Sequence, residues 1–170
     1  MDKGRIGESP GFTLIEIIVV VLIIGMIALI LLPRMTGLSS GSSGQVIRHL
    51  TGTIQTLRDE AEFNQKILRL NFNISEQRYD ASIQGEGGDF IPFHSDTVGK
   101  SEIGGNLVLK DVETLRQGKV SEGTACLFFF PLGRVEKGYL HFEEAGRPMT
   151  LQILSLSGKT KWLEGYVEDR

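Results

Sequence analysis

The chain has 170 residues, which is enough for one domain with an appendage rather than two large domains. Its composition is ordinary for a folded protein, and its net charge of −3 argues against a nucleic-acid binder that works through bulk positive charge. The single cysteine, Cys126, excludes an intramolecular disulfide framework. Its apolar neighbours predict a small buried side chain rather than a reactive thiol.

The first notable element is a long apolar segment near the N-terminus. Residues 17–32 carry no charge and are almost wholly apolar, whereas nearly all the charge follows Pro33. A helix over residues 12–32, rising about 1.5 Å per residue, reaches the ~30 Å needed to cross a bilayer core. Although the segment is rich in Ile and Val, backbone groups in lipid must satisfy one another, so helix is favoured over strand. We therefore expect a transmembrane helix over residues 12–33.

Two alternatives account for the same hydropathy. A cleaved secretory signal would need small residues at a cut site after the apolar segment, and residues 31–36 read LLPRMT. An uncleaved signal anchor fits the hydropathy, but it does not explain Glu16. A carboxylate inside an apolar span costs on the order of 2–3 kcal/mol, unless it lies close enough to the helix end to reach the interface.

The residues around Glu16 match a known pattern. Residues 11–16 read GFTLIE, and the apolar segment follows directly. This combination resembles the class III signal of type IV prepilins and type II secretion pseudopilins. The resemblance implies a leader of residues 1–11, which the prepilin peptidase removes by cutting between Gly11 and Phe12, and N-methylation of Phe12. It also implies that the helix stays with the mature chain and that Pro33 kinks it.

The resemblance gives Glu16 a role in assembly. Cleavage creates a positive amine at Phe12, and the Glu16 carboxylate of a neighbouring subunit can pair with it, which makes a costly charge tolerable and sets the helix register. Lys3 and Arg5 precede the span and Arg34 follows it, which weakly favours a cytoplasmic leader. We therefore expect a single-pass protein of the bacterial inner membrane with its C-terminal part in the periplasm.

Residues 34–170 are predicted to form a soluble head after a linker. The Gly/Ser-rich residues 34–44 predict a flexible segment, and the head is expected to span residues 45–170. Residues 45–64 predict an amphipathic helix, because apolar residues recur at three- and four-residue spacing from Val46 to Ala61. About six to eight short strands follow, predicted at residues 68–72, 78–83, 106–112, 127–130, 139–142, 150–156 and 161–167. Residues 85–88 and much of 92–105 are predicted as loops, and residues 131–133, 144–148 and 157–158 as turns.

The fold class is therefore α+β. We expect a long N-terminal helix, transmembrane and then amphipathic, followed by an antiparallel β-sheet or a two-sheet head. Residues 58–64 and 68–72, with residues 128–133 and 151–158, resemble the corresponding segments of the H-type minor pseudopilins. Type IV minor pilins that resemble the H type share this outline.

Motifs that would indicate catalysis or a cofactor fail in their context. The GLSSG at residues 37–41 follows an apolar span instead of a strand, and the GKT at residues 158–160 lacks the first P-loop glycine. The three histidines, His49, His94 and His141, are far apart in sequence, and the acidic loop around Glu86 and Asp89 matches no EF-hand. We expect no catalytic residue, no cofactor and no metal ligand. A thin basic segment at residues 159–162 is followed at once by acidic residues, so nucleic acid is not an expected partner.

The resemblance leads to one first hypothesis and two alternatives. The first is a minor pseudopilin that assembles near the tip of a type II secretion pseudopilus and supports protein export across the outer membrane. Its expected partners are other pseudopilins through their N-terminal helices, the prepilin peptidase, the inner-membrane assembly platform, membrane lipid and exported cargo. The second is a minor pilin of a type IV pilus that acts in initiation, adhesion or DNA uptake. The third, of another class, is a bitopic envelope enzyme or sensor with an uncleaved anchor.

Overall fold

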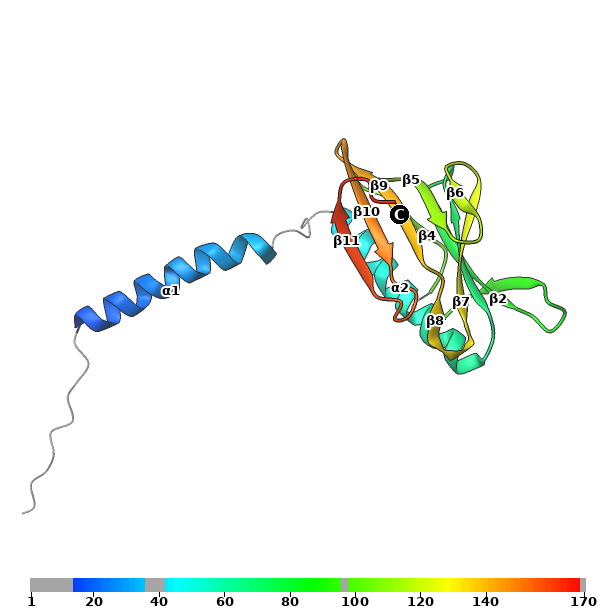
Figure 1. Ribbon diagram of the computed structural model, residues 1–170, viewed down its shortest axis with the longest axis horizontal. Coiled ribbons are helices and arrows are strands. Elements are labelled where there is room, and N and C mark those ends of the chain that lie inside the picture. Colours follow the sequence, from blue (N-terminus) through cyan, green and yellow to red (C-terminus); the bar gives the residue numbers. More distant parts are fainter. Residues whose placement is uncertain (1–13, 36–41, 96–97, 169–170) are drawn as a thin grey trace, which may run out of the picture. The chain divides into compact units, whose positions relative to one another are not determined.

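The computed structural model describes residues 14–35, 42–95 and 98–168. The chain divides into two compact units, Met1–Ser39 and Ser40–Arg170. The first unit contains helix α1 (Leu14–Met35), drawn in blue in Figure 1. The second unit, which we call the head, contains helix α2 and the strands β1 to β11 in its described part.

Helix α2 (Ser42–Asn64) buries one apolar stripe in the head. The stripe follows three- and four-residue spacing and consists of Ile47, Leu50, Ile54, Leu57 and Ala61. This confirms the amphipathic helix predicted for residues 45–64, although the buried stripe begins at Ile47 rather than at Val46, which is half-buried. The helix also begins earlier than predicted, so residues 42–44 of the segment predicted as flexible are helical, while residues 36–41 lie outside the described part.

The first sheet packs against α2 through β1 and β7. Its strand order is β3-β2-β1-β7-β8, with β4 paired to β2, and its recorded pairs are antiparallel. Leu68, Leu70 and Phe72 of β1 are fully buried, as their alternation with polar residues predicts. The strands of this sheet are β1 (Leu68–Asn73), β2 (Arg78–Gln84), β3 (Phe90–Phe93), β4 (Ser101–Glu102), β7 (Thr124–Phe130) and β8 (Arg134–Val135).

The second sheet is an antiparallel meander with one added hairpin. Its order is β11-β10-β9-β5-β6, so the hairpin of β5 and β6 joins the edge of β9. The strands are β5 (Leu107–Thr114), β6 (Gly118–Val120), β9 (Gly138–Glu144), β10 (Arg147–Ile153) and β11 (Thr160–Glu164). A 3-10 turn, η1 (Pro131–Gly133), connects β7 of the first sheet to β8.

These elements confirm the α+β class and select the two-sheet form of the head. The predicted number of strands was too low, and residues 92–105, predicted mostly as loop, contain β4 and the end of β3. β6 and β8 were missed as well, because strands of two or three residues are too short to show alternation. Pro92 inside β3 masked that strand, and its position near a sheet edge is where proline is tolerated.

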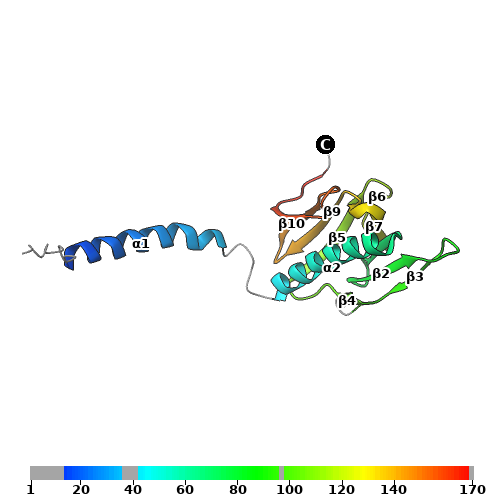
Figure 2. The ribbon, with the colours of Figure 1, turned by 90° about the horizontal axis from the view of Figure 1, so that it is seen from below.

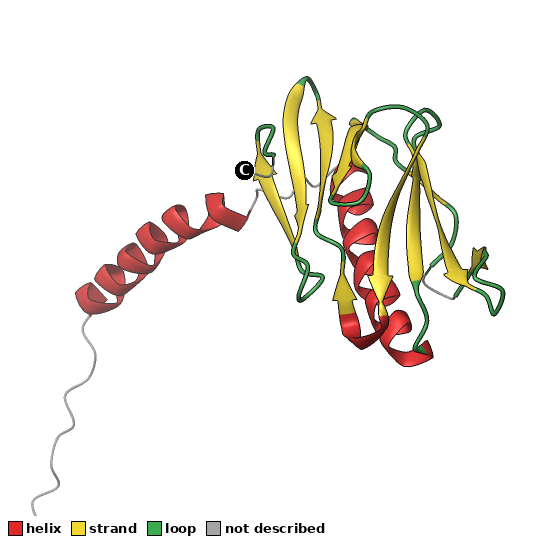
Figure 3. Cartoon of the chain, turned by 45° about the vertical axis from the view of Figure 1, so that its right-hand side comes forward, coloured by secondary structure: helices red, strands yellow, loops and turns green. Residues whose placement is uncertain are grey.

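Helix α2 contacts both sheets of the head (Figures 2 and 3). Besides packing on β1 and β7, it reaches the turn between β10 and β11 of the second sheet through two side-chain hydrogen bonds. Gln55 Nε2 donates a hydrogen bond of 2.5 Å to the Gly158 carbonyl, and Arg58 Nη1 donates one of 2.7 Å to the Ser157 carbonyl. The turn predicted at residues 157–158 therefore serves as the contact between the helix and the second sheet.

Candidate functional site

The structure describes only part of the predicted N-terminal site. Gly11 and Phe12 lie outside the described residues, so cleavage and methylation stay predictions. Glu16 lies in the first turn of α1 and is exposed in the single chain. A carboxylate is favoured at this place because the helix dipole presents partial positive charge at the N-terminus. The helix continues through Pro33 to Met35, and a kink at Pro33 stays a prediction.

Helix α1 leaves its apolar side chains uncovered in the single chain. Between Leu14 and Met26 the large apolar side chains are 46% to 81% exposed. Within the part of the chain that the structure describes, no helix is both long enough and apolar enough to cross a membrane. The transmembrane helix predicted over residues 12–33 begins before the described residues and stays a prediction.

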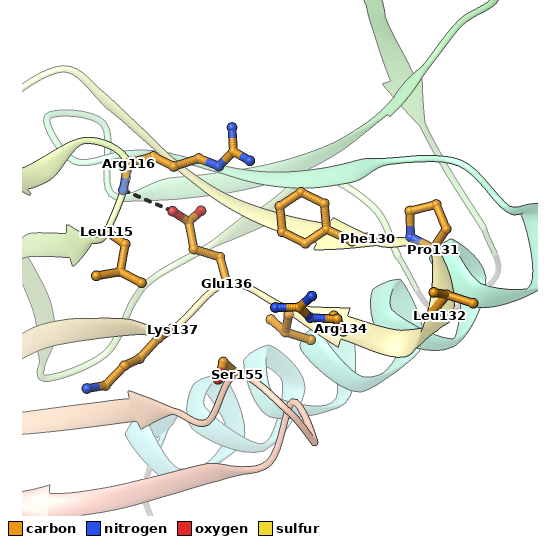
Figure 4. A pocket seen from close by; sticks show the side chains of 10 residues that line it. Leu115, Arg116, Phe130, Pro131, Leu132, Arg134, Glu136, Lys137 and Ser155 are labelled. Atoms are coloured by element: carbon orange, nitrogen blue, oxygen red, sulfur yellow. Dashed lines mark hydrogen bonds between the residues drawn. The ribbon is translucent and has the colours of Figure 1, made fainter.

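The head contains a surface pocket at η1, which we call the η1 pocket (Figure 4). It is an open cavity of about 490 Å³ between the β5–β6 turn, the end of β7 and the segment after β8. It is lined by Leu115, Arg116, Phe130, Pro131, Leu132, Arg134, Val135, Glu136, Lys137 and Ser155. The lining comes from both sheets, so the pocket exists only after the two sheets have packed together.

Glu136 forms the buried polar base of the η1 pocket. Its side chain is 6% exposed, and its carboxylate accepts hydrogen bonds from the backbone N–H groups of Arg116 at 3.1 Å and Phe128 at 3.3 Å. Burial raises the pKa of this carboxyl, while the two backbone hydrogen bonds and the nearby Arg116 act in the opposite direction. Glu136 therefore ties the β5–β6 turn to β7.

Two backbone N–H groups of β7 donate hydrogen bonds to side chains instead of to another strand. The Phe128 N–H donates to Glu136, and the Cys126 N–H donates to Gln117 Oε1 at 2.7 Å. The thiol of Cys126 is buried, as its sequence context predicts, and burial raises its pKa. A thiol with a raised pKa is a poor nucleophile, so the structure gives Cys126 a packing role.

A second polar cluster lies on the second sheet beneath the C-terminal segment. His141 is buried, and its Nδ1 lies 2.5 Å from Asp111 Oδ1 while its Nε2 lies 2.9 Å from the Val167 carbonyl. Because a carbonyl oxygen only accepts, Nε2 donates that bond. The Tyr166 hydroxyl also donates to Asp111, and its ring stacks on His141 with centroids 3.8 Å apart. Each group of this cluster is occupied by a neighbour, so it holds the C-terminal segment in place.

The structure does not bring the three histidines together into one site. His49 bonds to the Tyr79 hydroxyl at 2.7 Å, His141 belongs to the cluster under Val167, and His94 follows β3. No group of three His, Cys, Asp or Glu residues among those described could hold a metal ion. Of the acidic loop, Glu86 and Asp89 lie in the turn between β2 and β3.

Sequence reasoning missed the η1 pocket. Residues 131–133 were correctly predicted as a turn, but nothing in the sequence marks Leu132 as a residue with φ of 73°. That conformation is normally signalled by glycine or asparagine, and a leucine gives no such signal. The buried position of Glu136 was also hidden, because its neighbours Arg134 and Lys137 make the segment read as exposed.

Comparison with known proteins identifies the fold of the head. No protein-family model matches the sequence, and no curated protein is significantly similar to it. Among solved structures, the minor pseudopilin EpsH of the type 2 secretion system of Vibrio cholerae matches with a TM-score of 0.56 at 14% identity, over 73% of this chain and 98% of that chain. A crystal structure of the same protein also matches, with a TM-score of 0.53 at 13% identity, over 72% of this chain and 93% of that one. The resemblance to an H-type minor pseudopilin is thus confirmed in the fold: the head is built as a minor pseudopilin head is built.

Proposed function

We propose that this chain is a minor pseudopilin that assembles near the tip of a type II secretion pseudopilus. The observation that carries the proposal is the match of the two-sheet head, with α2 packed on it, to the minor pseudopilin EpsH. The head follows an apolar N-terminal segment that begins with the GFTLIE pattern at residues 11–16. The protein would therefore act by assembly, with no catalytic step of its own.

The N-terminal segment supplies the assembly chemistry in this proposal. The prepilin peptidase removes residues 1–11 and methylates Phe12, and the apolar helix remains in the inner membrane with the head in the periplasm. The exposed apolar side chains between Leu14 and Met26 then pack against lipid before assembly and against neighbouring pseudopilin helices after it. Glu16 pairs with the Phe12 amine of a neighbour and selects one axial offset between helices.

The intact mass of the membrane-extracted protein, with and without active prepilin peptidase, tests the class of the protein. The expected result is loss of residues 1–11 and gain of one methyl group only when the peptidase is active. An unprocessed N-terminus in the presence of active peptidase would contradict the proposal and support the anchored enzyme or sensor.

A Glu16 substitution tests the assembly role separately. In a strain lacking the native copy, Glu16→Gln keeps the size of the side chain and removes its charge, and we expect normal processing but loss of export. Glu102→Gln is the matched control, because Glu102 is exposed in the head and belongs to the other unit of the chain. If the wild-type copy restores pilus assembly in this strain but not protein export, the chain is instead a type IV minor pilin.

A further inference from the structure

The mouth of the η1 pocket exposes two apolar side chains. Leu115 is 75% exposed and Leu132 is 79% exposed, although both are large enough to be buried elsewhere. Leu132 also has a φ of 73°, in the left-handed region that leucine rarely adopts. A non-glycine residue held in such a conformation costs free energy and is found where a function requires it. In this conformation the Leu132 side chain lies exposed at the mouth of the pocket.

The turn that carries Leu132 is held firmly against α2. The next residue, Gly133, has a φ of 70°, and a Cβ placed there would lie 2.8 Å from Glu62 Oε2 of α2. The absence of a side chain at Gly133 therefore allows η1 to approach the helix closely. On the opposite side of the pocket, the Arg116 guanidinium lies 5.1 Å and 5.3 Å from the ring centres of Phe128 and Phe130. Both sides of the mouth thus pack against neighbouring parts of the head.

The charge of the η1 pocket is opposite to that of the chain. Three cationic residues, Arg116, Arg134 and Lys137, line it together with a single carboxylate, Glu136, whereas the whole chain carries a net charge of −3. The Glu136 carboxylate accepts two backbone N–H groups within the head, so it is already engaged. Arg134 is exposed, and among the described residues its side chain has no recorded ion pair. An occupant of this pocket meets a positive rim with apolar contacts beside it.

We propose that the η1 pocket docks an extended acidic segment of a different subunit of the filament, with carboxylates on the cationic rim and an apolar side chain between Leu115 and Leu132. The proposal rests on the proposed function for the identity of the partner as a filament subunit. Charge complementarity selects an acidic partner, and a cavity of about 490 Å³ lies within the range of peptide- and ligand-sized sites. Guanidinium groups bind carboxylates in a planar two-bond geometry, which gives the docking its direction.

The test uses the full chain in a neutral detergent and two fluorescent peptides. The acidic probe has the sequence Gly-Leu-Asp-Leu-Glu-Gly, and the matched probe replaces Asp with Asn and Glu with Gln. We expect fluorescence anisotropy to show that the acidic probe binds at least about 10-fold more tightly, with the difference shrinking at high salt. Equal binding of the two probes would overturn the proposal.

Substitutions test whether the acidic probe binds in the η1 pocket. Arg134→Ala and Leu132→Gly are each expected to weaken binding of the acidic probe about 10-fold. The control variants Arg147→Ala at the start of β10 and Ile91→Ser in β3 leave it unchanged. Leu132→Gly also removes the unfavourable φ, so its thermal unfolding midpoint stays equal or rises, which separates lost docking from lost folding. Binding that survives both pocket substitutions would refute the site.

Two further outcomes keep this proposal separate from the proposed function. Normal peptidase processing and export, together with absent probe binding, would overturn the docking site alone. Self-association of the full chain that is abolished by Arg134→Ala would assign the pocket to a second copy and overturn the choice of a different subunit. Sedimentation velocity of the wild type and of Arg134→Ala over a range of concentrations measures this outcome.

Discussion

At the scale of single residues, the buried carboxyl of Glu136 makes the stability of the head depend on pH. Burial raises its pKa in the folded head above the value in the unfolded chain, so the folded state binds the proton more tightly. The free energy of unfolding therefore falls as pH rises from the unfolded pKa to the folded pKa, and stays level above that interval.

The variant Glu136→Gln removes the titrating carboxyl and therefore tests in which direction this group changes stability with pH. We expect the stability of the wild type relative to Glu136→Gln to decrease with rising pH, as measured by urea unfolding from about pH 4 to about pH 8. The exposed Glu102→Gln serves as the control for removing a carboxylate elsewhere on the head. A wild-type advantage that grows with pH over the same interval would show that the hydrogen bonds from Arg116 and Phe128 outweigh burial.

A substitution at Gly133 distinguishes the free-energy cost of backbone strain from that of side-chain crowding. Gly133→Ala places a residue with a Cβ at φ of 70° and brings that Cβ to 2.8 Å from Glu62 Oε2. The crowded atom is the end of a flexible exposed side chain, which can move, whereas the backbone conformation costs about 1–2 kcal/mol. We expect Gly133→Ala to lose about that much unfolding free energy by chemical denaturation. Adding Glu62→Ala should not restore it, and full restoration would identify crowding as the cause.

At the scale of elements, one buried hydroxyl helps the His141 cluster to hold the C-terminal segment after β11. Thr150 is fully buried in β10, and its Oγ1 donates to the Gly165 carbonyl at 2.7 Å and accepts from the Val167 N–H at 3.1 Å. We expect Thr150→Val to lose about 1–3 kcal/mol, because it leaves both backbone groups without this partner. Hydrogen exchange of the Val167 amide should accelerate in Thr150→Val and stay slow in Thr150→Ser.

The elements differ in how well the sequence predicts them, for physical reasons. The helix from residue 45 and the strand at residues 68–72 were predicted because each buries one face, which imposes a period of 3.6 or 2 on the apolar residues. β8 has two residues and β4 has two, so their pairing depends on neighbouring strands instead of their own pattern. Sequence periodicity therefore predicts the long elements and leaves the short edge strands to the structure.

For the functional residues, the sequence yields a hypothesis only at the N-terminus, where Gly11 and Phe12 lie outside the described residues and the roles stay predictions. The pattern at residues 11–16 is local, so a single stretch of sequence carries the hypothesis for Gly11, Phe12 and Glu16. The η1 pocket joins residues 115–116, 130–137 and 155, which come together only through the packing of the two sheets. No local sequence pattern indicates that these residues come together. The residue type at position 132, a leucine, does not indicate its positive φ either.

At the scale of the whole molecule, the buried apolar core that the structure describes draws its side chains from the head. The buried apolar cluster extends from Ile47 to Ile153, within the unit Ser40–Arg170. We therefore expect a chain that begins at Ser40 to unfold in urea with the same midpoint as the full chain in the same detergent. A large decrease in the midpoint would show that the N-terminal unit stabilises the head.

The closed edge of β7 affects how the protein behaves at high local concentration. A strand whose outward N–H groups are free can recruit a strand from another copy, which starts aggregation. In this head the Cys126 and Phe128 amides already donate to Gln117 and Glu136, whose oxygens occupy the positions that carbonyls of an incoming strand would take. Copies of the chain at high local concentration thus find no template for edge-to-edge growth at these two amides.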